Sequence, residues 1–282
     1  MQLVEKELSG DVQGVLFAPR QHHDIGLLVL HGSSGKADTE RALLFAQLGV
    51  SALALRWFGG QGQSPGICEI PLEHFSIAID ALLDRGCKRI AVLGTSKGAE
   101  AALLLAVHDP RVMSVIAASP TSVVWANAGP GLDGLGWPLR SSWTLDGKSL
   151  PFVALDPYWR RETRDGLVAY RSWHEQSLRR FAVEAAEAAI PIERSRAEIL
   201  LVAGGDDALW PSDYFARALV NRAAIASKPI GLEIHPNAGH RILFPKETKQ
   251  RSVLHAHGGS DDADKELGAR AWAKAVHLLR LD

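Results

Sequence analysis

The sequence has 282 residues, of which 46% are hydrophobic and 22% are charged, and its formal net charge is −1. This balance gives no electrostatic reason to bind nucleic acid or an anionic membrane surface. The opening "MQLVEKELSG" has no apolar core of signal length, and no apolar run approaches the roughly 18 residues that span a bilayer. We therefore expect a cytoplasmic protein with a small-molecule substrate and with no nucleic-acid or membrane partner.

Short apolar runs alternate with helical patterns over most of the chain. Strands are predicted at 14–19, 25–32, 50–58, 89–94, 112–119, 197–204 and 230–236. Helices are predicted at 38–48, 72–85, 97–108, 213–227 and 264–281. Nearly continuous apolarity is typical of strands covered on both faces of a parallel sheet. The alternation therefore predicts a doubly wound α/β layer fold.

Three segments depart from this alternation. The stretch "LSGDVQG" (8–14) predicts an antiparallel hairpin at the N-terminal edge of the sheet. Residues 121–190 hold five tryptophans, several glycines and prolines, and one helical stretch. We interpret 121–190 as an insertion, a cap or lid over one end of the sheet, within a single domain spanning 1–282. The polar segment 255–265 is predicted to be a mobile loop.

The turn after the strand at 89–94 reads Gly94-Thr95-Ser96-Lys97-Gly98. A serine in a GxSxG turn between a strand and a helix is typical of the nucleophile elbow of the α/β-hydrolase fold. The structural alternative is a glycine-rich turn with an N-capping serine. The same glycines match neither the GxGxxG dinucleotide fingerprint nor the GxxxxGK[ST] phosphate loop. We therefore predict that Ser96 is a nucleophile.

A serine nucleophile needs a base and an orienting carboxylate, which in this fold follow in the order acid, then histidine. The stretch "ILLVAGGDDALWP" places Asp206 and Asp207 directly after a strand, and "IHPNAGHRILFP" places His240 after the next. Adjacent side chains point in different directions, so only one of the two acids can reach His240. The histidines without such a placement are expected to be surface or packing residues: His22, His23, His108, His174, His255, His257 and His277.

Acyl transfer also requires two backbone N–H groups that hold an oxyanion. One belongs to the residue after the nucleophile, here Lys97, whose side chain we expect to face solvent. The other belongs to the loop after an early strand, here "HGSSGK", where Ser33 is the first choice and Ser34 the second. The alternative for this loop is a simple glycine turn, in which Asp38 or Ser34 caps the following helix.

Three stretches resemble a known family: "GTSKGAEAALLLA", "PIERSRAEILLVAGGDDALWPSDYFARAL" and "IHPNAGHRI". They are similar to the C-terminal catalytic domain of acyl-CoA thioesterases and bile acid-CoA:amino acid N-acyltransferase, over roughly residues 10 to 280. The resemblance implies hydrolysis or transfer of acyl groups from coenzyme A thioesters. By position it implies that Ser96 is the nucleophile, Asp207 the orienting acid and His240 the base.

The sequence departs from the family pattern in two respects. Larger members carry an N-terminal β-sandwich domain, which we do not expect within these 282 residues. Members that conjugate acyl groups to amino acids resemble a cysteine-nucleophile form, whereas this elbow has Ser96. Serine favours water as the acyl acceptor.

The leading hypothesis is a serine hydrolase that cleaves an acyl thioester or ester through an acyl-enzyme. A carboxylesterase or dienelactone-hydrolase-like lactonase with the same triad is the alternative. A ligand-binding relative that has lost catalysis is a third possibility, against which the complete triad argues. No cofactor or metal is expected, because there is no HExxH motif and Cys68 and Cys87 form no CxxC pair.

The acyl pocket is expected at the carboxyl ends of the strands, where the insertion leaves the sheet. Tryptophans supply the broad apolar surface that such a pocket needs. The expected substrate-binding residues are Ser34, Trp137, Trp143, Trp159 and Trp210. Arg160, Arg161 and Arg164 could meet the phosphates of coenzyme A, although a solvated helix face explains them equally well.

Overall fold

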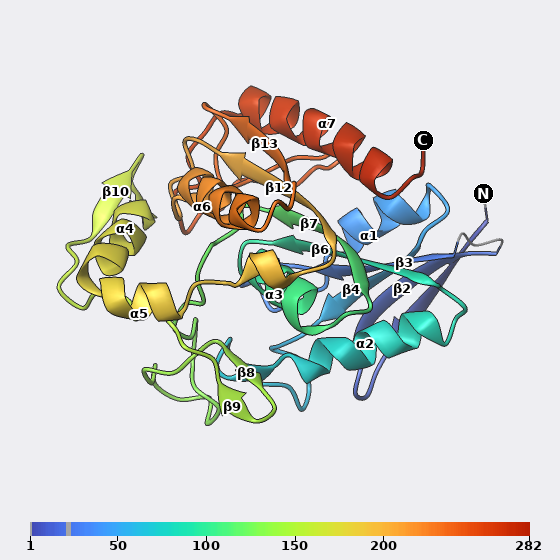
Figure 1. The fold of residues 1–282 in the computed structure, drawn as a ribbon, viewed down its shortest axis with the longest axis horizontal. Coiled ribbons are helices and arrows are strands. Elements are labelled where there is room, and N and C mark those ends of the chain that lie inside the picture. Colours follow the sequence, from blue (N-terminus) through green and yellow to red (C-terminus); the bar gives the residue numbers. More distant parts are fainter. Residues whose placement is uncertain (1, 21–23) are drawn as a thin grey trace.

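The computed structural model describes residues 2–20 and 24–282, and within them the main sheet has eight strands (Figure 1). The spatial order is β1-β2-β4-β3-β6-β7-β12-β13. The two pairings that involve β2 are antiparallel and all the others are parallel. The bounds are β1 (Leu3–Leu8), β2 (Gln13–Pro19), β3 (Ile25–Leu30), β4 (Ser51–Arg56), β6 (Arg89–Thr95), β7 (Val112–Ala118), β12 (Glu198–Gly204) and β13 (Gly231–His235).

Helices cover both faces of this sheet, which confirms the predicted doubly wound α/β architecture (Figure 1). One face carries α2 (Glu73–Leu83), α3 (Lys97–His108) and α6 (Ser212–Ile225), and the other carries α1 (Thr39–Ala46) and α7 (Asp261–Leu278). Each face of the sheet packs against its helices in a separate hydrophobic core. Alternate residues of β3 point into the two cores: Leu28 and Leu30 into the core under α2, α3 and α6, and Leu27 and Val29 into the core under α1 and α7.

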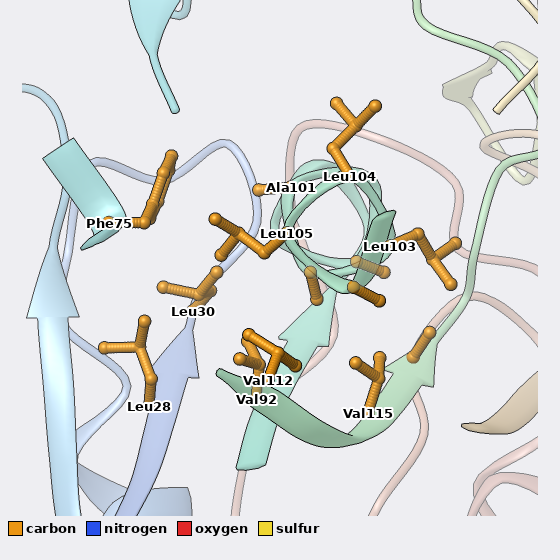
Figure 2. Close-up of a cluster of buried hydrophobic side chains, with 14 of the residues drawn as sticks. Leu28, Leu30, Phe75, Val92, Ala101, Leu103, Leu104, Leu105, Val112 and Val115 are labelled. Carbon is orange, nitrogen blue, oxygen red and sulfur yellow. The ribbon is translucent and has the colours of Figure 1, made fainter. Parts of the chain in front are cut away.

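Helix α3 lies over the middle of the sheet with its apolar run buried. Figure 2 shows Leu105 directed toward Leu30 and Phe75, with Val92 and Val115 of the neighbouring strands below the helix. Every residue from Lys97 to Ala106 is buried. The N-terminus of α3, which follows Ser96, therefore rests on a rigid apolar base.

The elements between β7 and β12 lie outside the main sheet and extend from one end of it (Figure 1). β8 pairs with β9 and with β5 from an earlier segment, whereas β10 and β11 form a separate hairpin. Their bounds, with those of the remaining short elements, are β5 (Ile70–Pro71), β8 (Trp143–Leu145), β9 (Lys148–Ser149), β10 (Glu162–Arg164), β11 (Leu167–Ala169), α4 (Arg171–Arg180), α5 (Ala182–Glu187) and η1 (Ile192–Arg194).

Two local predictions are decided by the backbone. The N-terminal hairpin is confirmed, since β1 and β2 pair from Leu3↔Pro19 to Leu8↔Gly14. The mobile loop at 255–265 is wrong in its second half, because α7 begins at Asp261. Ser260 caps this helix by accepting a hydrogen bond from the Ala263 amide, and acids in the first turn complement the helix dipole.

Among the described residues, no helix combines the length and the apolarity needed to cross a bilayer.

Candidate active site

Ser96 occupies a sharp turn between β6 and α3, with φ 56° and ψ −120°. Such a backbone is strained for a residue with a side chain. The flanking glycines explain how the turn packs. A Cβ at Gly94 would lie 2.1 Å from the Gly98 carbonyl oxygen, and one at Gly98 would lie 2.4 Å from that of His31. Glycine is therefore required on both sides of the serine, as a nucleophile elbow demands.

Asp207 and His240 follow β12 and β13 at the same edge of the sheet as Ser96. His240 Nδ1 lies 2.8 Å from Asp207 Oδ2, and both side chains are buried. The other carboxylate oxygen, Oδ1, accepts hydrogen bonds from the Leu209 and Trp210 amides at 2.9 and 3.3 Å. These contacts hold the carboxylate so that it orients the imidazole, leaving His240 Nε2 available for chemistry.

The neighbouring acid, Asp206, has a different partner. Its two carboxylate oxygens accept hydrogen bonds from the Arg164 guanidinium, both at 2.7 Å, and Oδ2 also accepts one from the Gly259 amide at 2.9 Å. The hydrogen bonds from Arg164 lower the pKa of Asp206 below its usual value. Asp206 therefore joins the hairpin β10–β11 to the loop after β12, while Asp207 meets His240.

The two predicted oxyanion residues, Ser33 and Lys97, line the same cavity as Ser96 and His240. Lys97 is the first residue of α3, so its amide has no partner within the helix. Its side chain corrects the sequence prediction, because it is buried rather than exposed to solvent. Nζ lies 2.6 Å from Glu100 Oε2 and 2.8 Å from Ser142 Oγ. Burial lowers the pKa of Lys97, and Glu100 opposes that shift.

Glu100 joins α3 to the segment between β7 and β12. Its Oε1 accepts hydrogen bonds from the Trp125 amide at 3.0 Å and from Trp143 Nε1 at 2.7 Å. Glu100 is fully buried, and its opposite charge compensates that of Lys97. This buried pair therefore ties the turn that carries Ser96 to residues far away in the sequence.

A second buried charge, Arg41 of α1, connects the loops around the site. Its guanidinium donates to Thr95 Oγ1, next to Ser96, at 2.5 Å and to the Ile242 carbonyl, after His240, at 2.6 Å. Glu247 compensates the charge at 2.7 Å. Arg41 therefore fixes the strand before the serine relative to the loop after the histidine.

A cavity of about 260 Å³ opens beside Ser96. Two of the predicted substrate-binding residues line it, Trp137 and Trp210. Ser34, Trp143 and Trp159, which all belong to the described chain, are not among its lining residues. The lining residues are Ser33, Ser96, Lys97, Trp125, Ala126, Asn127, Ala128, Trp137, Leu155, Tyr170, Trp173, His174, Leu209, Trp210, His240 and His255.

The three residues that do not line the cavity have other partners. Trp143 is fully buried in the core against Glu100. Trp159 stacks on Trp173, with ring centroids 5.1 Å apart. The Ser34 hydroxyl lies 2.8 Å from His31 Nδ1. Burial lowers the pKa of this imidazole.

A family model described as "BAAT / Acyl-CoA thioester hydrolase C terminal" matches residues 70–280. The chain belongs to this family. Acyl-coenzyme A thioesterase 1 of Homo sapiens is 26% identical over 257 residues, covering 89% of this chain and 57% of the relative. Acyl-coenzyme A amino acid N-acyltransferase 1 of Mus musculus is 27% identical over 247 residues, covering 86% and 54%. The chain thus spans little more than half the length of these curated relatives.

Solved structures of hydrolases share the fold of this family member. A dienelactone hydrolase-like phosphotriesterase from metagenomic libraries has a TM-score of 0.55 at 16% identity, covering 99% of this chain and 96% of its own. An esterase from Pyrococcus furiosus has a TM-score of 0.54 at 16% identity, covering 99% and 91%. At this identity the likeness shows the fold alone. The predicted α/β-hydrolase fold is confirmed.

Among the histidines, sequence reasoning missed two that line the cavity, His174 and His255, which it assigned to the surface or to packing. The aromatic rings of Trp125 and Trp210 lie 4.7 and 5.7 Å from His174. Burial lowers the pKa of His174 to about 4, so this imidazole is neutral near pH 7. In the sequence, the position of His174 within the tryptophan-rich insertion was the one feature that could have indicated a cavity residue.

Of the remaining histidines, His108 and His277 are exposed, which confirms the prediction of surface residues. His257 packs with its ring 5.9 Å from His240, and burial lowers its pKa to about 4. His22 and His23 lie outside the described residues.

The three arginines of the insertion are not equivalent. Arg160 and Arg161 are exposed, whereas Arg164 forms the ion pair with Asp206. Arg164 is therefore held by the protein itself and is not free to bind a phosphate group. Within the residues that the structure describes, no group of His, Cys, Asp or Glu side chains is arranged to hold a metal ion.

Proposed function

We propose that this chain is a serine hydrolase that cleaves an acyl thioester of the coenzyme A type through an acyl-enzyme. The observation that carries the proposal is the strained elbow of Ser96, which shares a cavity with His240 while His240 bonds to the buried Asp207. The relatives named as acyl-coenzyme A thioesterases support a thioester as the substrate.

In this mechanism the Ser96 hydroxyl attacks the thioester carbonyl carbon while His240 Nε2 accepts its proton. The carbonyl oxygen thereby becomes an oxyanion, which the backbone amides of Ser33 and Lys97 stabilise. When the C–S bond breaks, His240 returns the proton to the leaving thiolate. Water, deprotonated by His240, then attacks the carbonyl carbon of the acyl-enzyme. The bond from this carbon to Ser96 Oγ breaks, His240 returns the proton to Ser96 Oγ, and the carboxylic acid leaves. Asp207 holds the imidazole in the required tautomer throughout.

We also propose that residues 1–282 act as one domain, in which 121–190 forms the cap over the catalytic loops. Trp125, Trp137, Tyr170, Trp173 and His174 from this segment line the cavity that Ser96 reaches. The mostly apolar wall suits the acyl group of the substrate.

Covalent labelling with a fluorophosphonate tests the nucleophile. We expect one label per chain, mapped by peptide mass spectrometry to Ser96 and abolished by Ser96→Ala. Release of thiol from acyl-coenzyme A substrates, followed with a thiol reagent, tests the reaction. Labelling of another residue, or none, would contradict the triad and would favour a ligand-binding protein without catalysis.

A carboxylesterase is the second candidate, and one observation favours it. Arg164 forms an ion pair with Asp206, so of the three arginines only Arg160 and Arg161 could bind the phosphates of coenzyme A. A carboxylesterase needs no such phosphate contacts. Comparing kcat/KM for acyl-coenzyme A and for an uncharged ester of the same acyl group separates the candidates. If Arg160→Ala/Arg161→Ala raises KM for the coenzyme A ester alone, the thioesterase is favoured. If the uncharged ester is the better substrate and the variant changes neither KM, the carboxylesterase is favoured.

A further inference from the structure

The loop between Asn127 and Arg140 exposes a dense group of large apolar side chains. Leu132, Leu135, Trp137 and Leu139 are 62, 72, 70 and 68% exposed. Asp133 is the only charged residue between positions 129 and 139. Singly exposed leucines are ordinary, but four large exposed apolar side chains between positions 132 and 139 mark a segment that binds something. We call residues 129–139 the flap.

The base of the flap is held in place. The Asn127 amide donates to the Arg140 carbonyl at 2.9 Å, and Ala128 exchanges two backbone hydrogen bonds with Ile67 at 2.8 and 3.0 Å. At its tip, Gly134 and Gly136 have φ values of 74° and 48°, which glycine adopts without strain. The flap is thus a loop with a fixed base and an apolar tip.

The flap is continuous with the candidate active site. Residues 126–128 at its base and Trp137 within it line the cavity that contains Ser96. Because Trp137 lines the cavity and is also largely exposed, its ring stands where the cavity meets solvent. An apolar group attached to Ser96 and directed outward would meet Trp137, which belongs to the same loop as the three exposed leucines.

We propose that the flap is an acyl-recognition element, in which Trp137 and the flap leucines bind the part of the acyl group that projects from the cavity. The inference rests on the proposed acyl-enzyme hydrolysis. Each carbon buried against the flap adds favourable apolar contact, so the flap raises reactivity toward extended acyl groups and does nothing for an acetyl group. It selects among substrates of one reaction and takes no part in bond breaking.

The test compares p-nitrophenyl decanoate with p-nitrophenyl acetate, because their ratio of kcat/KM cancels any general loss of catalysis. We expect Leu132→Ser/Leu135→Ser/Leu139→Ser to lower the decanoate-to-acetate ratio by about tenfold, the effect of losing one or two apolar contacts in a substrate site. Trp137→Ala should lower the ratio in the same direction. Hydrolysis of acetate by the triple leucine variant, whose substituted residues do not line the cavity, should stay close to that of the wild-type chain.

Ile225→Ser is the matched control, since Ile225 is 87% exposed at the end of α6 and does not line the cavity. It should leave the ratio unchanged. An equal loss on both esters, or an unchanged ratio in the flap variants, would overturn the inference. If the wild-type chain forms an oligomer that the flap variants do not form, and the ratio is unchanged, the inference is also overturned and the flap is an interface between copies. If the wild-type chain hydrolyses neither ester or acyl-coenzyme A, the proposed function itself fails.

Discussion

At the carboxyl edge of the sheet, Ser96, Asp207 and His240 each follow a strand of the main sheet, whereas the insertion reaches the same cavity through short strands and loops. The edge residues are held by backbone contacts between neighbouring loops, such as the 2.9 Å bond from the Ser96 amide to the Ala118 carbonyl. The insertion is held by backbone hydrogen bonds to earlier loops, such as the 2.9 Å bond from the Glu69 amide to the Ser141 carbonyl, and by Glu100, which accepts hydrogen bonds from Trp125 and Trp143. In the proposed function, this difference separates the chemistry, assigned to the ends of the sheet strands, from acyl recognition, assigned to the short strands and loops of the insertion.

The largest expected effect falls on the edge of the sheet. Asp207→Asn should lower kcat by about 10,000-fold, because the imidazole of His240 loses its tautomer and its counter-charge. Asp206→Asn should cost far less, since Asp206 bonds to Arg164 and not to His240. Steady-state hydrolysis of one ester by both variants provides the measurement. If Asp206→Asn proved the more damaging, the assignment of the triad acid would be wrong.

The next effect concerns the attachment of the insertion. Glu100→Gln should lower the free energy of unfolding by about 3–5 kcal/mol, because it leaves the buried Lys97 charge without compensation. Urea denaturation measures the loss. Glu198→Gln is the control: Glu198 pairs with Arg280 at 3.2 Å on the surface, and such pairs are worth about 1 kcal/mol or less. Similar losses in both variants would show that the buried pair does not anchor the insertion.

A smaller effect is expected at the ion pair between the hairpin β10–β11 and the sheet. Arg164→Ala should change the free energy of unfolding by less than about 1 kcal/mol, because both side chains are partly exposed. The folded-state pKa of Asp206 is depressed, so the contribution is present above the unfolded pKa of about 4 and is lost as pH falls through the folded value.

Denaturation of the wild-type chain and Arg164→Ala between about pH 7 and about pH 3 tests this sign. The difference between the two proteins should shrink toward acid. A difference that grows toward acid would show that Asp206 is not the charge that Arg164 stabilises.

The smallest expected effect lies in the cavity wall. His174 has a pKa of about 4, so it stays neutral over the range in which a catalytic histidine titrates. His174→Phe should therefore leave the acid limb of the pH profile of kcat/KM where it is, even if KM changes. A displaced limb would mean that His174 exchanges protons during turnover and that the insertion contributes to the chemistry.

The sequence by itself determined the layer architecture and the edge at which the candidate catalytic residues gather. Strands 89–94, 197–204 and 230–236 are apolar and short, and parallel strands expose their carboxyl ends at one edge. The turns that follow these strands carry Ser96, Asp207 and His240. The glycines on both sides of Ser96 are needed because a side chain there would clash with the backbone. These patterns depend only on residues that are close together in the sequence, so they can be recognised without a structure.

Only the tertiary structure decided where the side chains of Lys97 and of the tryptophans in the insertion point. Lys97 turns inward because Glu100 and Ser142, 45 residues later, meet it in the core. Trp143 is buried against Glu100 while Trp137 stands at the cavity mouth, although both belong to the same tryptophan-rich stretch. These orientations depend on contacts between segments far apart in sequence, and burial without a partner is costly for a charge. The composition of one segment does not reveal which residues from distant segments will contact it.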